Sequence, residues 1–523
     1  MTSRRHALQP EVVLVADRTL SGNYQVLFEG IFATMQTTET PGLLWRKLLS
    51  PKLPVDGQGR ARVAPLGIRR IEAALRNRLG LSAWQVACAS PESVGSLLGP
   101  WTKLVCVSSS DPLGEGMSNT TTKVFCGGQL YTKKLTGRMM QQIRTAKEKH
   151  GFAVLFGGAG AWQYRRSPQV AAAHGIDCVF EGYFEDRGPQ IVSDVLAGKR
   201  PPAYASEPTT CAPAVESILA PSVMGSVELS RGCGKGCSFC VAGPMKMQHV
   251  EPKTILADIE TNLAGGVSNV VSSSEDFFRY GANGPKVNFD ALHDLLSRMR
   301  RLEGLRFMQI DHGNISSVAQ LDDEQLTEIR RLLSWDAQTD GLWVNLGVES
   351  ASGRLVAATG AGKIAPFSAD DWPELVYESV AKLDRCGFFP VVSLVLGLEG
   401  ETPDDVAATA RLVERLAEMR VVIFPVFHEP LAGDGAFHLG RMRPDQLELF
   451  RTCYELNFRR VPGLYCDNQR AGGVRWSKRA LVQLLGRGEV WLWRRRFARM
   501  SRRIGASAET RPGPEPSPES SSA

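Results

Sequence analysis

The sequence predicts an α/β protein in which a doubly wound sheet domain precedes a partial (β/α)6 barrel and a helical C-terminal cap. Two series of short apolar segments alternate with helical patterns, and this alternation is typical of parallel sheets covered by helices. A Pro-, Ala-, Ser- and Thr-rich segment separates the two series and predicts a linker. The 523 residues are enough for several domains.

The first series covers residues 1–198. Helical periodicity over Ile68–Leu79 and Arg138–His150 predicts helices that cover a parallel sheet. Insertions at Leu43–Val63 and Gly116–Leu135 are rich in Gly, Pro, Thr and Lys, so we expect loops there. The predicted strands are Val12–Ala16, Gln85–Ala89, Leu104–Ser108, Val154–Phe156 and Cys178–Phe180.

The second series follows the predicted linker, residues 199–221, and occupies residues 222–429. Six strand-and-helix units fit a partial barrel, in which functional residues lie at the carboxyl ends of the strands. Residues 430–504 predict a helical cap, and the Pro-, Ser- and Glu-rich residues 505–523 predict a disordered tail. The predicted barrel strands are Ser226–Ser230, Asn269–Ser273, Leu305–Ile310, Leu342–Val348, Pro390–Leu396 and Val421–Val426.

Composition and charge describe a globular protein. The net charge of +6 is concentrated near the C-terminus, and no basic face with interleaved aromatic residues recurs elsewhere, so we expect no nucleic-acid partner. The N-terminal stretch lacks an apolar signal core, and the longest apolar run, Phe388–Leu398, is well short of the ~20 residues that span a bilayer. We therefore expect a cytoplasmic protein with free thiols.

The C-terminal segment "EVWLWRRRFARMSRR" predicts a helix with an aromatic and arginine-rich surface. Trp491, Leu492 and Phe497 would lie beside a row of arginines. One interpretation is a solvated helix that closes the cap against the barrel. The other is a weak contact with a membrane surface, because aromatic and basic side chains suit anionic headgroups.

The segment "SRGCGKGCSFCVAG", Ser230–Gly243, carries three cysteines within eight positions. A disulfide framework uses pairs, and a structural zinc site needs four ligands that no nearby motif completes. Cys233, Cys237 and Cys240 instead suit a [4Fe–4S] cubane that leaves one iron open. For the other eight cysteines we expect core packing.

This C-x-x-x-C-x-x-C motif, placed after the first barrel strand, resembles that of the radical S-adenosylmethionine (SAM) enzymes. The resemblance implies that the open iron binds the amino and carboxylate groups of SAM and that electron transfer yields a 5′-deoxyadenosyl radical. The aromatic residue that the family places before the last cysteine matches Phe239. An external electron donor of the flavodoxin or ferredoxin type is also implied.

Further segments continue the resemblance. "SSSED", Ser272–Asp276, stands where the family holds the methionine ammonium, which makes Glu275 the candidate ligand, although serines replace the family's glycines. "GVESAS" makes Glu349 a second candidate for SAM binding, and "LGLEGETPDD" resembles the segment near the adenine and also fits a helix N-cap. His312 follows the third strand and is either structural or a candidate catalytic or substrate-binding residue.

The domain in front resembles the cobalamin-binding domain of B12-dependent radical SAM enzymes. "VSSSDPLG", "LFGGAGAW" and "VFEGYFED" follow three successive strands. By resemblance, Ser108, Ser110, Gly157, Gly158 and Gly182 would line the cobalamin site, where glycine permits close approach. The Asp-x-His-x-x-Gly segment that supplies a lower axial histidine is missing, so cobalt would lack a protein histidine. A plain nucleotide-binding domain is the alternative, but its Gly-x-Gly-x-x-Gly is missing after the first strand.

The resemblance implies a cobalamin-dependent radical SAM C-methyltransferase that acts on an unactivated carbon of a small-molecule or peptide substrate. One alternative is a non-methylating B12 radical SAM cyclase, oxidase or rearrangement enzyme acting on a tetrapyrrole or another metabolite. Another is a cobalamin-responsive binding module that keeps the cluster as a redox sensor. A methylthiotransferase needs an additional N-terminal cysteine cluster, which the scattered Cys88, Cys106, Cys126 and Cys178 do not form.

Overall fold

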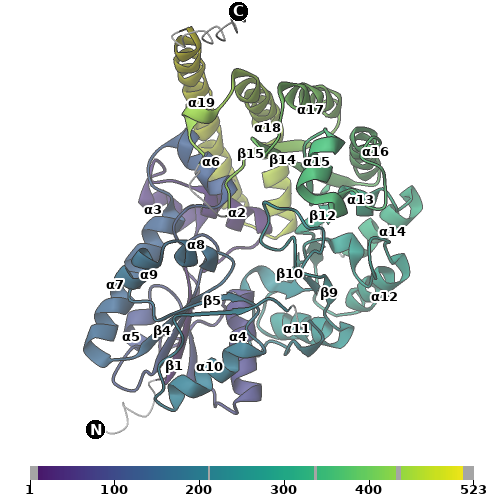
Figure 1. Ribbon diagram of the computed structural model, residues 1–523. Coiled ribbons are helices and arrows are strands. Elements are labelled where there is room, and N and C mark those ends of the chain that lie inside the picture. Colours follow the sequence, from purple (N-terminus) through teal and green to yellow (C-terminus); the bar gives the residue numbers. More distant parts are fainter. Residues whose placement is uncertain (1–9, 210–211, 335–338, 432–436, 510–523) are drawn as a thin grey trace, which may run out of the picture.

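The computed structural model describes residues 10–209, 212–334, 339–431 and 437–509, with side chains as far as residue 499. An α/β domain, a barrel-like domain and a pair of long C-terminal helices pack into one body (Figure 1). The fold predicted from the sequence is confirmed. The differences concern individual elements and are given below.

The N-terminal domain is a six-stranded parallel sheet in the order β2-β1-β3-β4-β5-β6. Residues of β1 alternate between two cores: Val12 and Leu14 face helices α4 (Leu66–Arg78) and α10 (Arg187–Leu196), while Val13 and Val15 face α5 (Val94–Leu97) and α7 (Tyr131–His150). Both faces are therefore covered, as a parallel sheet requires. The strands are β1 (Val12–Ala16), β2 (Val86–Ala89), β3 (Leu104–Ser108), β4 (Ala153–Gly157), β5 (Cys178–Gly182) and β6 (Tyr204–Glu207).

Strand β6 lies within residues 199–221, which the sequence analysis assigns to a linker. It pairs in parallel with β5, with Val179 opposite Tyr204, and forms the edge of the sheet. The linker prediction is wrong over this strand. The prolines on either side of β6 favour a linker in a sequence-based prediction. Proline is nevertheless tolerated beside an edge strand, because an edge strand forms backbone hydrogen bonds with one neighbouring strand only.

Helix α6 (Met117–Cys126) occupies an insertion for which we predict a loop. Its Ser, Asn and Thr residues have modest helix propensity, so tertiary packing stabilises it. Phe125 is buried and stacks on Phe450 at 4.2 Å between ring centroids, and the Thr121 hydroxyl accepts a hydrogen bond of 2.9 Å from the backbone N–H of Phe427. Helix α6 thus leaves the N-terminal domain and packs on the barrel.

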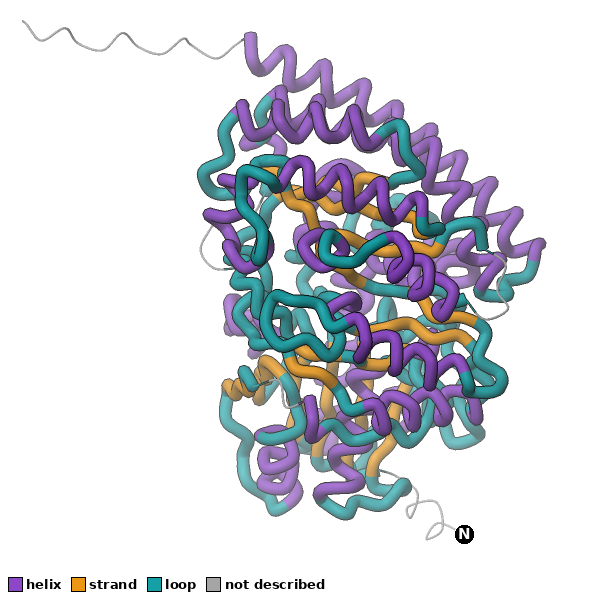
Figure 2. The backbone as a smooth tube through the Cα atoms, turned by 90° about the vertical axis from the view of Figure 1, so that its right-hand side faces the viewer, coloured by secondary structure: helices purple, strands orange, loops and turns teal. Residues whose placement is uncertain are grey.

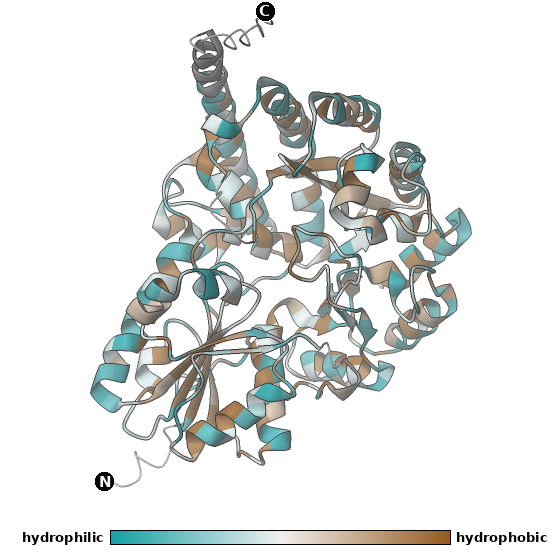
Figure 3. Ribbon diagram, in the orientation of Figure 1, coloured by the Kyte–Doolittle hydropathy of each residue, from teal (hydrophilic) through white to brown (hydrophobic). Residues whose placement is uncertain are grey.

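The second domain has two parallel sheets, β11-β10-β7 and β12-β13-β14-β15. The third predicted strand, Leu305–Ile310, appears as β11 (Phe307–Gln309), and a further strand that we did not predict, β12 (His312–Asn314), follows it in the second sheet. Apolar strands carry the core, whereas the outer helices are largely polar on their solvent side (Figure 3). The other strands are β7 (Ser226–Glu228), β10 (Asn269–Ser273), β13 (Leu342–Glu349), β14 (Phe388–Leu396) and β15 (Val422–Phe427).

Helices cover the outside of this partial barrel, as the βα pattern predicts. Each begins after a strand and returns the chain to the amino-terminal end of the next strand. The principal covering helices are α11 (Pro252–Ala264), α12 (Phe289–Arg300), α14 (Asp323–Leu333), α16 (Trp372–Arg385) and α17 (Pro403–Leu416).

Helices α18 (Pro444–Ala471) and α19 (Trp476–Glu509) form the cap and run side by side across one end of the molecule (Figure 2). Trp493 and Phe497 are buried against Phe125, Phe450 and Tyr454, so the expectation that Phe497 lies on the surface is wrong. Trp491 and Leu492 are exposed, as expected. Of the described helices, none combines the length and apolar character needed to cross a membrane.

Candidate functional site

The three-cysteine loop follows β8 (Ser230–Arg231), beyond the carboxyl end of the first barrel strand. The Cys233 N–H donates to the Met245 carbonyl at 2.9 Å, and the Gly236 N–H donates to the Gly243 carbonyl at 2.9 Å. Gly234 and Gly236 have φ angles of 71° and 74°, in the left-handed region that favours glycine. The glycines between the cysteines therefore let the loop fold back on itself.

A second segment holds the loop from the barrel side. The Ser238 N–H donates to the Thr359 carbonyl at 2.8 Å, and Gly360 lies against Cys237. A Cβ added at Gly360 would come within 2.8 Å of the Cys237 sulfur and 2.9 Å of its Cα. The C-terminal end of helix α15 (Gly353–Gly360) thus fixes the position of the middle cysteine.

Of the three cysteines, Cys237 is buried, while Cys233 and Cys240 are partly exposed. Burial raises the pKa of Cys233 to about 11 and also raises the pKa values of Cys237 and Cys240, while Lys363 opposes the last two shifts. Metal binding would have to displace their protons, which couples loading to pH. No three His, Cys, Asp or Glu side chains in the described ranges converge on a single ion. In a cubane each thiolate binds a different iron, so a cluster does not require the three thiols to converge on a single ion.

Two buried lysines flank the loop. Lys363 pairs with Glu349, and both side chains are less than 10% exposed. Burial would lower the pKa of Lys363, but the carboxylate of Glu349 outweighs that effect and raises it. Lys235 donates to the Ser316 hydroxyl at 2.9 Å and lies 3.8 Å from Asp276. The negative charge of Glu349, the second candidate for SAM binding, is therefore already balanced by Lys363.

Glu349 also has an unusual backbone. Its φ is 64°, in the left-handed region, next to an irregularity in the pairing of β13 with β14. For a residue other than glycine, this backbone conformation raises the free energy of the folded state by about 1 kcal/mol or more, and it occurs often at functional sites. The bend turns the chain from β13 toward the segment that packs on Cys237.

Glu275 follows β10, as the sequence analysis requires of a ligand for the methionine ammonium. Its side chain is solvent-accessible and makes no hydrogen bond or salt bridge, yet enough protein surrounds it to raise the pKa of its carboxyl. The neighbouring Asp276 is fully buried, accepts from Ser317 Oγ at 2.6 Å and leaves its Oδ1 without a partner. A free carboxylate beside a buried one is a suitable setting for an ammonium group.

His312 lies in the same polar group at the start of β12. Its Nδ1 is 3.0 Å from Asp311 Oδ1, and its Nε2 is 2.7 Å from the side-chain amide of Asn345. Burial would lower the pKa of His312, but Asp311, with a smaller contribution from Glu275, raises it to about 9. Both ring nitrogens of His312 are thus engaged by protein groups, and 43% of its side chain remains accessible.

The carboxyl edge of the N-terminal sheet carries the residues predicted for cobalamin. Ser108, Ser110, Gly158 and Gly182 are at least partly accessible, whereas Gly157 is buried. The Asp17 N–H donates to the Ser108 carbonyl at 2.9 Å. This bond joins the ends of β1 and β3, between which the strand order reverses and where such sheets bind ligands.

The two exposed glycines serve the packing of this chain itself. Gly158 has a φ of 90°, and a Cβ there would lie 2.6 Å from Ser108 Oγ. Gly182 has a φ of 97°, and a Cβ would lie 1.9 Å from the Glu207 carbonyl oxygen. A side chain at either position would therefore disturb neighbouring loops before it met any ligand, which corrects our reason for expecting glycine there.

The loop after the carboxyl end of strand β5 in the N-terminal sheet contacts the cysteine loop. The Tyr183 hydroxyl accepts from the Gly232 N–H at 3.2 Å, and Arg231 pairs with Glu185 at 2.7 Å in a fully buried salt bridge. Met117, at the start of α6, packs in one apolar group with Phe239 and Cys240. The structure thus brings the two predicted cofactor edges together.

Sequence reasoning missed several residues of this region, among them Lys235, Lys363, Asp311 and Tyr183. Lys235 lies inside the cysteine motif, so its position carried a signal. Asp311 stands next to the candidate His312, and Tyr183 lies within "VFEGYFED", so their positions carried a signal too. Lys363 reaches the site through its tertiary contact with Glu349, which neither spacing nor periodicity reveals. The described cysteines outside the motif are free thiols, and Cys88, Cys106 and Cys178 are buried in strands.

Comparisons with known proteins agree with this geometry. Residues 227–413 match the family model of the radical SAM superfamily. An uncharacterised protein of Archaeoglobus fulgidus is 25% identical over 219 residues, 39% of this chain and 40% of that protein. The tRNA-2-methylthio-N(6)-dimethylallyladenosine synthase of Corynebacterium diphtheriae is 23% identical over 290 residues, 54% of this chain and 53% of the synthase. The matches span about half the length of these curated relatives or less.

A solved structure extends the likeness to the N-terminal domain. The radical SAM methyltransferase TsrM from Kitasatospora setae, with a tryptophan substrate and a SAM analogue bound, aligns with a TM-score of 0.52 at 14% identity, over 84% of this chain and 83% of TsrM. A second TsrM structure, with cobalamin and a [4Fe–4S] cluster, aligns with a TM-score of 0.51 at 15% identity, over 85% and 81%. Residues 227–413 are therefore a radical SAM domain, and the fold of the chain, N-terminal α/β domain included, is similar to that of TsrM.

Proposed function

We propose that this enzyme is a cobalamin-dependent radical SAM methyltransferase that methylates an unactivated carbon. The observation that carries the proposal is the apposition of the two carboxyl edges, joined by the bond between Tyr183 and Gly232 and by the salt bridge between Arg231 and Glu185. A methyl donor held on one edge and a radical generated on the other must act on the same substrate. Adjacent edges meet that need.

The residues present fit the groups that the proposal requires. Cys233, Cys237 and Cys240 would hold a [4Fe–4S] cluster, Glu275 would bind the ammonium of SAM, and Phe239 would pack beside it. Glu349 is tied to Lys363, so we assign it to shaping the SAM site through that pair. When bound, these groups would supply a reductively generated carbon radical and a transferable methyl group.

The edge loops would hold cobalamin. The loop after β3 is tightened by Asp111, whose carboxylate accepts from the Glu115 N–H at 2.8 Å and from Gln163 Nε2 at 2.6 Å. This network joins the loops after β3 and β4, so Ser108 and Ser110 sit on a prearranged surface. We propose that cobalt there carries no histidine from this protein.

The chain's own residues would orient the substrate and control charge. His312, held by Asp311 and Asn345, lies in the same polar region as Glu275 and would help to position that carboxylate electrostatically. The buried lysines place positive charge next to the cysteine loop, which favours an anionic cluster electrostatically.

The partners and location belong to the same proposal. We infer a small-molecule or peptide substrate, an external reductant of the flavodoxin or ferredoxin type, no nucleic acid, and work in the cytoplasm, where free thiols and an iron–sulfur cluster persist. The exposed Trp491 and Leu492 beside arginines support a weak contact with anionic membrane surfaces.

Product analysis tests the proposal. The anaerobically reconstituted enzyme, given cobalamin, a reductant and methyl-deuterated SAM, is incubated with extracts of a deletion strain. Methyl transfer predicts a product that gains a labelled methyl group. A dehydrogenated or rearranged product without the label would assign the enzyme to the non-methylating group, and tight cofactor binding without turnover would indicate a sensor.

Cobalamin content and spectroscopy test the cofactor separately. The Co(II) form should give an electron paramagnetic resonance spectrum without nitrogen splitting from a protein histidine. Such a splitting would contradict the proposed cobalt environment, and a failure to retain cobalamin would contradict the assignment of the N-terminal domain.

A further inference from the structure

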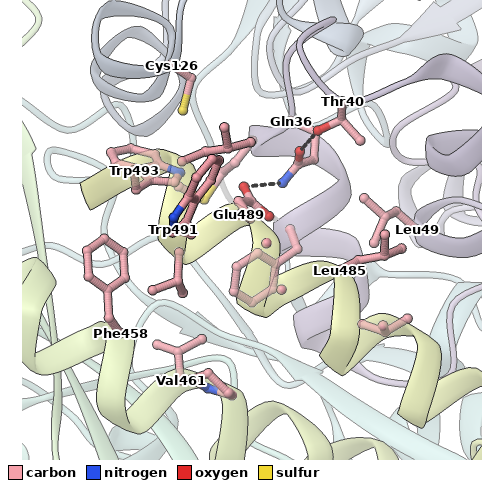
Figure 4. Close-up of a pocket in the computed structure, with 18 of the residues that line it drawn as sticks. Gln36, Thr40, Leu49, Cys126, Phe458, Val461, Leu485, Glu489, Trp491 and Trp493 are labelled. Carbon is pink, nitrogen blue, oxygen red and sulfur yellow. Dashed lines mark hydrogen bonds between the residues drawn. The ribbon is translucent and has the colours of Figure 1, made fainter. Parts of the chain in front are cut away.

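A cavity of about 590 Å³ lies between the C-terminal helices and the N-terminal insertion, outside the barrel. Helices α18 and α19 form one side, and α2 (Leu27–Met35), the loop after it and α6 form the other (Figure 4). The volume falls in the range of about 300–1,000 Å³ that is typical of small-molecule sites. None of the predicted cofactor residues lines it.

The wall of the cavity is mainly aromatic and aliphatic. Its few polar groups bond to one another: Thr40 donates to Gln36 Oε1, and Gln36 Nε2 donates to Glu489 Oε1 at 3.2 Å (Figure 4). No lining side chain has a buried polar atom left without a partner. The apolar residues include Phe32, Leu44, Leu49, Phe424, Tyr454, Phe458, Val461, Tyr465, Leu485, Trp491 and Trp493.

Self-paired polar groups offer an incoming ligand little to bind by hydrogen bonds. Burial raises the pKa of Glu489, so its carboxyl places less negative charge in the cavity than an ordinary glutamate would. Transfer of hydrocarbon from water into such a space is favourable in proportion to the apolar area buried. The interior therefore suits a hydrocarbon chain better than a sugar, nucleotide or peptide backbone.

The rim has a different character. Leu484, Trp491 and Leu492 line the cavity and are each about half exposed or more. The guanidinium of Arg495 lies 3.7 Å from the centroid of the Trp491 ring, and Arg496, which lines the cavity, pairs with Glu39 at 3.2 Å through one of its nitrogens. An apolar interior with guanidinium groups at its rim is complementary to a molecule that has a hydrocarbon chain and an anionic head group.

We propose that this cavity binds a single-chain anionic amphiphile, with the hydrocarbon chain between the two C-terminal helices on one side and α2 and α6 on the other, and the carboxylate or phosphate at Arg495 and Arg496. The proposal does not rest on methyl transfer and holds for the chain without its cofactors. It commits to a monomeric ligand. Vesicle binding that depends on the cavity interior while free amphiphile does not bind, or a second copy of this chain that covers the cavity, would overturn it.

Isothermal titration calorimetry of the full-length protein with decanoate, below its micelle concentration, tests the proposal. We expect saturable binding of one decanoate per chain, and binding of neutral decanol at least about tenfold weaker, because the guanidinium pairing contributes roughly 1.5–3 kcal/mol. Arg495→Gln together with Arg496→Gln should reduce the difference between the two ligands. Equal affinities for both in the unmodified protein would overturn the assignment of an anionic end.

Cavity-filling variants test the location. Leu485→Trp on α19 and Val461→Phe on α18 should each weaken decanoate binding at least about tenfold, because each fills space the chain needs. Leu481→Trp is the matched control, since Leu481 is exposed on the same helix and does not line the cavity. Circular dichroism must show the same helix content in all three.

Three results would overturn the proposal. The first is equal decanoate binding by Leu485→Trp, Val461→Phe and the control. The second is a dimer in sedimentation velocity that Leu485→Trp dissociates, because a second copy would then cover the cavity. The third is binding to anionic vesicles that the filling variants abolish while the free decanoate monomer fails to bind.

Discussion

The Tyr183 hydroxyl accepts a hydrogen bond of 3.2 Å from the backbone N–H of Gly232, and this contact ties the end of the N-terminal sheet to the start of the cysteine loop. Arg231 stacks on the Tyr183 ring at 4.5 Å while it pairs with Glu185 and Glu228. The loop that would carry the cluster is therefore positioned partly by the other domain. A substitution in the N-terminal domain at this contact should therefore also alter the cysteine loop, and a substitution in the loop should alter the end of the sheet.

Replacement of Cys233, Cys237 and Cys240 together by Ala should abolish iron binding. The reconstituted parent protein should hold about four irons per chain and absorb broadly in the visible range, as thiolate-ligated clusters do. Iron analysis and absorption spectra check this. The control is Cys386→Ala, a buried thiol outside the motif, which should keep its iron. A triple variant that retains the cluster would refute the ligand assignment.

Gly360→Ala should displace the middle cysteine without unfolding the protein. The added Cβ would meet the sulfur and Cα of Cys237, and overpacking of this kind costs about 1–3 kcal/mol. We expect a several-fold loss of cluster occupancy, measured as iron per chain. Gly67→Ala is the control, since no atom lies within 4 Å of its Cβ position. Full occupancy in Gly360→Ala would show that the loop tolerates the shift.

Glu275→Gln should weaken SAM binding and leave the cluster in place. Loss of a charge-assisted bond to an ammonium costs about 1.5–3 kcal/mol, which corresponds to roughly a 10- to 100-fold higher Kd. Equilibrium dialysis with labelled SAM on the reconstituted protein measures it. Glu303→Gln, an exposed carboxylate near the opposite ends of the strands, provides the comparison. Unchanged affinity in Glu275→Gln would remove Glu275 from the SAM site.

The pair of His312 and Asp311 should make stability depend on pH in the alkaline range. The folded pKa of His312 is about 9, above the usual 6.5, so the charged histidine stabilises the folded state fully below pH 6.5. That contribution is lost as the pH rises through about 9. Because 43% of the side chain is accessible, solvent screening limits the effect to about 1 kcal/mol or less.

Urea unfolding between pH 6 and 10 checks this dependence against Asp311→Asn. The variant lacks the carboxylate that raises the histidine pKa, so its free energy of unfolding should fall less over the same range. Nuclear magnetic resonance of the His312 ring gives the pKa directly. A value near 6.5 in the parent protein would contradict the ion pair.

The C-terminal helix should bind anionic vesicles weakly and in a salt-sensitive way. Each basic residue near such a surface contributes up to about 1 kcal/mol. Truncation before Glu489 is an unsuitable test because it would remove the buried Trp493 and Phe497. Substitution of Gln for the exposed Arg487, Arg495 and Arg499 should instead abolish co-sedimentation, whereas the same change at Arg200, Arg301 and Arg411 should not. A parent protein that stays in the supernatant at low salt would refute the contact.

Much of the fold could be predicted because the three main sheets are parallel and most of their strand residues are buried. Such strands are nearly continuous apolar runs, and Val12–Ala16, Leu104–Ser108 and Asn269–Ser273 appear in the structure with the predicted bounds. The elements that failed depend on partners distant in sequence. Helix α6 is held by Phe450 and Phe427, and β6 is defined by its pairing with β5.

The site shows the same division. The cysteines share one loop, so their spacing alone indicates a cluster. The pairing of Lys363 with Glu349 and the contact of Gly360 with Cys237 arise only when β13 and its following turn fold onto that loop. Sequence spacing also could not show that the space beside Gly158 and Gly182 is taken by neighbouring backbone and side chains.

Helix α6 has a consequence for how such enzymes can be recombined. It belongs by sequence to the front domain, but its Phe125 completes the aromatic stack of Phe427, Phe450 and Trp493 in the rear half. A chimera that exchanged the front domain at the segment before β7 would import a foreign helix into that stack. A chimera with an exchanged N-terminal domain would therefore have to keep α6 from the same parent protein as the C-terminal cap.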